Sequence, residues 1–235
     1  MIKPTTLLLL LISLPLTTPM AYAQLDEIVV TGSRISGDDY SQIPAVTVDK
    51  RADFLVQQIQ LTNDTRDEVS RKKEIYQTIR DLLTDAEKQP GIALGYGDEF
   101  LIPITTKDYE IALNSDSKRP DTSNTELYVK LAIGPGDDVN KSLAALRAFI
   151  KKARVSGRTE IESEDEEALS IVNPERYRFE IIAQIANDAK KLQAAIGASC
   201  KVDISGLSNR IQWKRSDISQ LTLYVPYEVS LVGCQ

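Results

Sequence analysis

The chain has 235 residues, of which 28 are Lys or Arg and 34 are Asp or Glu, so its formal charge is −6 at pH 7. It contains no His, which excludes His-dependent catalytic triads and zinc sites that need imidazole. The acidic balance supplies no basic footprint for nucleic acid, and the composition is that of an acidic globular protein.

Residues 1–23 have the pattern of a secretory signal peptide. Lys3 precedes an apolar run centred on residues 7–12, and Ala21-Tyr22-Ala23 supplies the small residues of a cleavage site. The alternative, a membrane anchor, is disfavoured because the run is shorter than the roughly 20 apolar residues that a span needs, and two prolines interrupt it. We therefore expect cleavage after Ala23 and a mature chain from Gln24, without a transmembrane segment, in the periplasm. Association with the outer membrane is the second expected location.

Residues 24–43 form a polar leader around one apolar cluster, Ile28-Val29-Val30. The leader has too few apolar residues to bury a core, so it is not expected to fold alone. Two interpretations of the cluster stay open: it docks onto the chain's own domain, or it remains available for a partner.

From about residue 44 to residue 235 the apolar patterns predict α+β structure, either as one compact domain or as two interlocked α+β lobes. The predicted β elements are 45–48 together with 54–61, then 92–104, 125–133, 158–172, 201–214 and 219–232, and the predicted helices are 65–86, 139–153 and 174–196. We expect antiparallel-rich sheets in the order β-α-β-β-α-β-α-β-β. Each helix carries one apolar face, so the three amphipathic helices are expected to pack on one face of the sheet.

The start of each predicted helix carries a capping signal. Thr65 and Glu68 fit the Ser/Thr-x-x-Glu capping box, and either Asp137 or Asp138 can cap the second helix. Asn173-Pro174 places a capping residue before a proline at the first helical position.

No pattern in the chain marks a catalytic, cofactor or metal site. Gly95-Tyr96-Gly97 lacks the third glycine and the following helix of a dinucleotide-binding loop, which favours a tight connection between strands. The acidic run at 160–167 lacks the alternating spacing of a calcium loop, which favours a solvated loop. Lys141 and Ser142 are adjacent on a helix, where neighbours do not face each other. We therefore expect a non-enzymatic protein without cofactor or metal.

The two cysteines, Cys200 and Cys234, are expected to form a disulfide in an oxidising compartment. If 201–214 and 219–232 form one hairpin, opposite residue numbers add to about 434, which the two cysteines satisfy. The same register places Trp213 opposite Leu221 as a cross-strand pair. A nucleophilic or redox role is disfavoured because the chain has no CxxC motif and no His.

The leader contains a short resemblance to a known family. Residues 26–35, Asp-Glu-Ile-Val-Val-Thr-Gly-Ser-Arg-Ile, resemble the segment that follows the signal peptide of many TonB-dependent outer-membrane receptors. In that family a β-prone stretch adds as a strand to the energy-coupling protein through main-chain hydrogen bonds. The resemblance covers ten residues and does not imply receptor activity. It implies partner binding, to a TonB-type protein, by Glu27, Ile28, Val29, Val30 and Thr31.

Most of the remaining chain resembles the SIMPL-domain family of bacterial periplasmic and outer-membrane-associated proteins. Val46-Thr47-Val48 stands before Ala52-Asp53, and a strand beginning at Asn124 precedes the helix at 139–153. Residues 185–197, rich in Asp and Ala and ending in Gly, resemble the third helix of that family. The resemblance implies an envelope protein that self-associates and is linked to stress tolerance, and it brings no catalytic residues.

These observations give one leading hypothesis, one alternative, and a third hypothesis, an enzyme of unknown type, which would require a pocket with converging carboxylates or a Ser–Lys pair. The leading hypothesis is a non-enzymatic, exported cell-envelope protein that acts through protein–protein contacts, including contacts with copies of itself. The alternative is an accessory protein of a TonB-linked uptake system that uses its leader for strand addition. None of these hypotheses includes nucleic acid as a partner.

Overall fold

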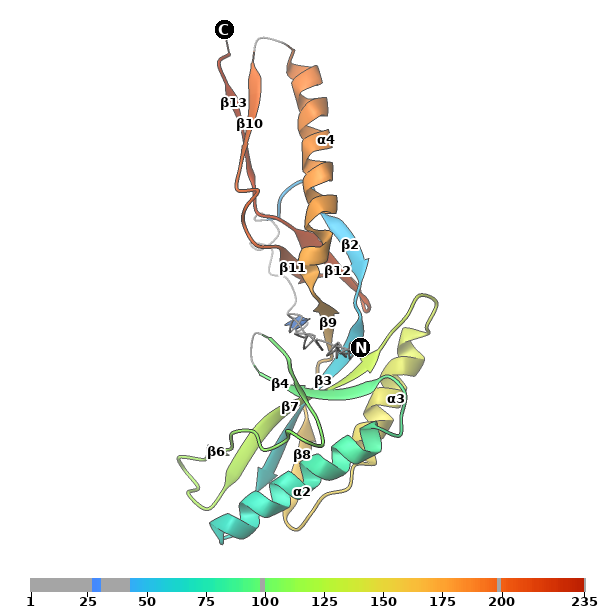
Figure 1. The fold of residues 1–235 in the computed structure, drawn as a ribbon, viewed down its shortest axis with the longest axis vertical. Helices are drawn as coiled ribbons and strands as arrows, with labels where there is room; N and C mark the ends of the chain where they lie inside the picture. The colour runs from blue at the N-terminus through green and yellow to red at the C-terminus, as the bar shows by residue number, and fades with distance from the viewer. Residues whose placement is uncertain (1–26, 31–42, 98–99, 198–199, 235) are drawn as a thin grey trace, which may run out of the picture.

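The computed structural model describes residues 27–30, 43–97, 100–197 and 200–234, and these form two lobes along one long axis (Figure 1). The first lobe holds the largest sheet and two helices, and the second holds the third helix and two smaller sheets. One buried apolar cluster includes Ile59 of the first lobe and Ile181 of the second. The two lobes therefore share a core.

Regular structure accounts for most of the described chain. The strands are β1 (Glu27–Val30), β2 (Val48–Arg51), β3 (Phe54–Asn63), β4 (Ile92–Tyr96), β5 (Ile102–Ile104), β6 (Asn114–Ser115), β7 (Ser123–Ala132), β8 (Thr159–Ser163), β9 (Ala168–Val172), β10 (Lys201–Ser205), β11 (Gln212–Arg215), β12 (Gln220–Tyr224) and β13 (Glu228–Val232). The helices are α2 (Glu68–Ala86), α3 (Val139–Lys151) and α4 (Arg178–Ile196), and α4 follows a 3₁₀ turn, η1 (Pro174–Tyr177). The prediction of an α+β fold with antiparallel sheets is confirmed.

The largest sheet has the strand order β1-β9-β3-β7-β4-β5, with β8 paired to β3 and β6 paired to β7. Its centre is the antiparallel ladder of β3 and β7, which runs from Phe54 opposite Ala132 to Asn63 opposite Ser123. Side chains on a strand alternate between the two faces of the sheet, so each face of this ladder has its own set of residues.

Helices α2 and α3 cover one face of the largest sheet. Leu127 and Val129 of β7 belong to the same buried cluster as Ile79 of α2 and Leu146 of α3. The alternate residue Tyr128 belongs to a separate small cluster on the other face, with Val56, Leu101, Ala168 and Phe54. Both faces near the β1 end of the sheet are therefore buried.

The helix starts differ from the predictions in two of three cases. Asp67 caps α2, since its carboxylate accepts a hydrogen bond from the Ser70 N–H at 2.8 Å, so the capping box at Thr65 is wrong. Asp138 caps α3, one of the two residues that the sequence allowed. Asn173 precedes Pro174 at the start of η1, as predicted, but it makes no side-chain capping bond and has a φ of 48°, and α4 itself begins at Arg178.

The third helix does not lie on the face that α2 and α3 cover. Helix α4 packs beside β10 in the second lobe, next to the two-stranded sheet of β10 and β13 and the three-stranded sheet of β11, β12 and β2 (Figure 1). The expectation that all three helices share one sheet face is therefore wrong. Helix α4 instead forms the second lobe together with these two smaller sheets.

The predicted C-terminal hairpin is divided between these two sheets. Lys201 pairs with Val232 in one sheet, whereas Trp213 pairs with Leu223 in the other, so the predicted pairing of Trp213 with Leu221 is wrong. The chain bends at Gly206, whose φ is +85°, and a Cβ atom there would lie 2.8 Å from the Pro226 carbonyl oxygen. The bend separates the outer strands from the inner ones.

Candidate interaction surfaces

The leader segment that resembles a TonB-binding sequence forms a strand of the protein's own sheet. Strand β1 pairs antiparallel with β9, with Ile28 opposite Ile171. On the other side of β1, Ile28 forms a bridge with Phe100, and the Leu101 N–H donates to the Glu27 carbonyl oxygen at 2.9 Å. Both edges of β1 therefore meet the same chain. Thr31 lies outside the described residues.

A buried ion pair fixes the start of β1. The Glu27 carboxylate contacts the Lys130 ammonium, and the two side chains are 7% and 8% exposed. The Ser170 hydroxyl donates to Glu27 Oε1 at 2.5 Å, and the Lys130 ammonium lies 4.3 Å from the centre of the Phe54 ring. Charged groups this deeply buried are stabilised only when they are paired and hydrogen-bonded.

Neither Lys130 nor Ser170 stands out as a functional residue in the sequence. Lys130 occupies the sheet face that points away from the helices, between Tyr128 and Ala132. The sequence gives one signal: Lys130 is the only lysine in an otherwise apolar stretch of β7, and a buried lysine needs an acidic partner. The sequence could not show that Glu27, 103 residues away, supplies it.

Both cysteines of the predicted disulfide lie at the free end of the second lobe. Cys200 and Cys234 are bonded, with their Cα atoms 4.2 Å apart. Since no free cysteine occurs in the described residues, and the sequence has two, the predicted pairing is confirmed. The bond joins the chain just before β10 to the chain just after β13.

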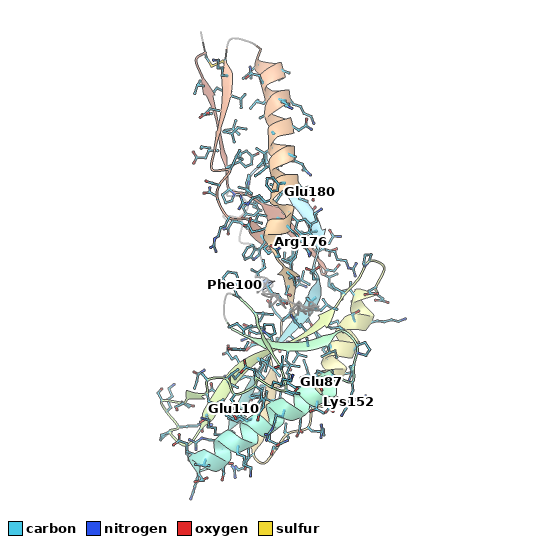
Figure 2. All side chains as sticks on the ribbon, viewed as in Figure 1. Glu87, Phe100, Glu110, Lys152, Arg176 and Glu180 are labelled. Atoms are coloured by element: carbon cyan, nitrogen blue, oxygen red, sulfur yellow. A yellow bond between two sulfur atoms is a disulfide. The ribbon has the colours of Figure 1, made fainter. Side chains whose placement is uncertain are left out.

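The second lobe exposes large apolar side chains. On β13, Val229, Leu231 and Val232 are 41%, 48% and 45% exposed, and Phe179 in the first turn of α4 is 81% exposed. Polar residues flank the start of α4, where Arg176 and Glu180 are labelled in Figure 2. Exposed apolar residues that gather on one element are typical of an interaction surface, whereas isolated ones are common on any protein.

One cavity lies between β1 and the base of the second lobe. It has a volume of 370 Å³ and is lined by residues that include Ile28, Phe100 and Trp213. Glu175 also lines it, and although burial opposes ionisation, hydrogen bonds from the Arg178 guanidinium and the Ile211 N–H lower the pKa of this carboxyl. The Glu175 carboxylate is thus already hydrogen-bonded within its own chain.

Comparisons with known proteins give no family: no family model matches the chain, and no curated protein matches it. Among the described residues, no group of three acidic or sulfur side chains is placed to hold a metal ion. No helix in the described part of the chain is both long and apolar enough to cross a bilayer.

Proposed function

We propose that this protein is exported to the periplasm and acts there, without catalysis, through protein–protein contacts that include copies of itself. The observation that carries the proposal is strand β13, which lies at the edge of a lobe that projects from the main body (Figure 1). Three apolar side chains of this strand are exposed. An uncovered strand edge offers main-chain hydrogen-bonding groups to another chain. Natural proteins usually protect such edges, so an open apolar edge favours a binding role.

Two further features support the proposal. The disulfide between Cys200 and Cys234 is compatible with an oxidising compartment such as the periplasm. The resemblance to the SIMPL-domain family suggests an envelope protein connected with stress tolerance, with the outer membrane as the alternative site of association.

The proposal is tested by fractionation and native mass. The periplasmic fraction should contain a chain that starts at Gln24, and in-cell cross-linking should capture it in complexes larger than the monomer. A matched culture that expresses the chain without residues 2–23 supplies the cytoplasmic control. A periplasmic chain that stays monomeric and forms no cross-linked complex would contradict a contact-based role.

The alternative, strand addition to a TonB-type protein, requires β1 to leave its place. Residues 27–30 would have to separate from β9 and from the Phe100–Leu101 segment, and Lys130 would lose its buried partner. Deleting the leader would therefore damage the fold as well as any partner site. A peptide of residues 24–35, added to a TonB-type protein in solution, separates the two effects, and saturable binding would support the alternative.

A further inference from the structure

The two edges of the β10–β13 ribbon differ. Strand β10 meets α4 on its outer edge, where the Val202 N–H donates to the Gln193 side-chain oxygen at 3.0 Å. Strand β13 pairs with β10 alone among the described strands. Helix α4 therefore covers the outer edge of β10, whereas the other edge of β13 meets no described strand and can accept one.

The backbone groups on the open edge can be assigned from the Gln193 bond. Because the Val202 N–H points toward α4, Val202 and its partner Leu231 form a pair that exchanges no hydrogen bonds across the ribbon. Such pairs alternate along an antiparallel ladder, so Ile204 and Val229 form the next one. The N–H and C=O groups of Val229 and Leu231 therefore point outward from β13.

The side chains of the same two residues extend an apolar row. Val229 and Leu231 lie on one face of the ribbon with their partners Ile204 and Val202. The strand contains no Lys and no Pro, and its only charged residue is Glu228. The lysine and proline that often block pairing at an edge are thus absent from β13, and its one charge stands at its first residue.

We propose that β13 pairs antiparallel with β13 of a second copy, about a two-fold axis at Ser230. This inference rests on the proposed function and specifies the surface that self-association uses. In this register Val229 of one copy lies opposite Leu231 of the other, so outward-pointing backbone groups meet outward-pointing groups and apolar side chains meet apolar side chains. The result is a four-stranded sheet, β10-β13-β13-β10, with four new main-chain hydrogen bonds.

The charges on the opposite face fit this arrangement. Glu228 of one copy lies opposite Val232 of the other, and Val232 pairs with Lys201. Two strand spacings place Glu228 and Lys201 of different copies roughly 10 Å apart at their Cα atoms, within reach of two long side chains. No two like charges are opposed. A two-fold axis makes both copies use the same surface, which the self-complementary sequence of β13 allows.

A five-residue edge buries less surface than a standard stable interface, so the isolated dimer should be weak, with a Kd in roughly the micromolar range. Sedimentation of the disulfide-bonded protein should show a mass that rises with concentration.

Val229→Pro removes an outward N–H and keeps the bonds to β10, because proline is tolerated where the N–H of an edge strand faces solvent. This variant should stay monomeric at every concentration, as should Val229→Lys.

Val69→Lys is the matched control, since Val69 is 77% exposed on α2, far from the ribbon. It should dimerise like the unmodified protein. Circular dichroism of each variant should show that the monomer is still folded. If Val229→Pro and Val229→Lys are folded and still associate, the β13 pairing is refuted, although the proposed function stands. If the unmodified protein never associates and captures no partner, both are refuted.

The register has its own test. Ser230 faces Ser230 of the second copy as a pair without hydrogen bonds, for which the Cα atoms are about 4.5 Å apart, inside the range of a disulfide. Ser230→Cys should therefore oxidise to a covalent dimer in the periplasm. Glu228→Cys is the control in the same strand. In the proposed register each Glu228 lies opposite Val232, so the two introduced cysteines would be four residues apart along the strands. A monomeric Ser230→Cys protein, or equal cross-linking of both variants, would overturn the assignment.

Discussion

Replacing Glu27 with Gln should destabilise the protein strongly, because it leaves the Lys130 ammonium buried without a counter-charge. Removing one partner of a buried ion pair typically costs about 3–5 kcal/mol. Gln keeps one oxygen that can accept from the Ser170 hydroxyl, and Lys130 keeps its contact with the Phe54 ring. We therefore expect the lower end of that range, about 3 kcal/mol, which corresponds to a fall in Tm of roughly 6–12 °C for a chain of this size.

The assay is urea unfolding followed by the fluorescence of Trp213, the only tryptophan in the sequence. Glu180→Gln is the matched control: its carboxylate is 2.8 Å from the Lys50 ammonium, but the Glu180 side chain is 43% exposed. An exposed pair of this kind contributes at most about 1 kcal/mol. The double variant Glu27→Gln/Lys130→Met, compared with each single variant, then gives the coupling energy between the two groups.

The expected coupling is about 2–3 kcal/mol, with the double variant less destabilised than the sum of the single ones. If Glu27→Gln and Glu180→Gln shift the midpoint equally, then Glu27 is not buried against Lys130 in solution. The leader would then be detached from the sheet, and the TonB-linked alternative would gain support.

Three other predictions concern the disulfide, an acidic contact and a helix cap. The denatured, unreduced protein should contain no free thiol, and Cys200→Ser with Cys234→Ser should lower the free energy of unfolding by about 3–4 kcal/mol, measured in urea. Hydrogen bonds, first from the Asn63 amide, lower the pKa of Glu74, so its contribution is complete above the ordinary glutamate pKa and is lost as pH falls through the lowered value. Glu74→Gln should flatten the acid side of a stability-against-pH curve, and an unchanged curve would contradict this account. Asp138→Ala should cost about 1 kcal/mol by removing a cap, which thermal unfolding would detect.

Elements that depend on local patterns could be predicted from the sequence. The apolar spacing in α2 and α3 follows the helical repeat, and Asp138 was one of two predicted caps. The cap of α2 was misassigned because two suitable residues, Thr65 and Asp67, lie within three positions. The Thr65 hydroxyl instead donates to the Glu74 carboxylate at 2.8 Å, a contact that no local rule reveals.

Elements that depend on distant partners could not be predicted in the same way. The disulfide followed from residue numbers that add to 434, and the observed β10–β13 pairs, such as Lys201 with Val232, add to 433. The inner pair Trp213 and Leu223 adds to 436, because the chain bends at Gly206 and the inner strands join β2. The pairing predicted for one continuous hairpin is therefore nearly correct for β10 and β13 and wrong for β11 and β12.

The two ends of the described chain show why a β-prone segment alone does not identify a partner site. Strand β1 has the sequence of a pairing segment, but its edges meet β9 and Phe100, and Glu27 neutralises a lysine that would otherwise be buried alone. Strand β13 has no such partner beyond β10 among the described strands, and its apolar side chains are exposed. A short strand pairs within its own chain where the fold places another strand edge beside it and a group that neutralises its charge. Where the fold supplies neither, the strand is left for another chain. On that criterion β1 serves the fold of the monomer, and β13 is the better candidate for contact with another molecule.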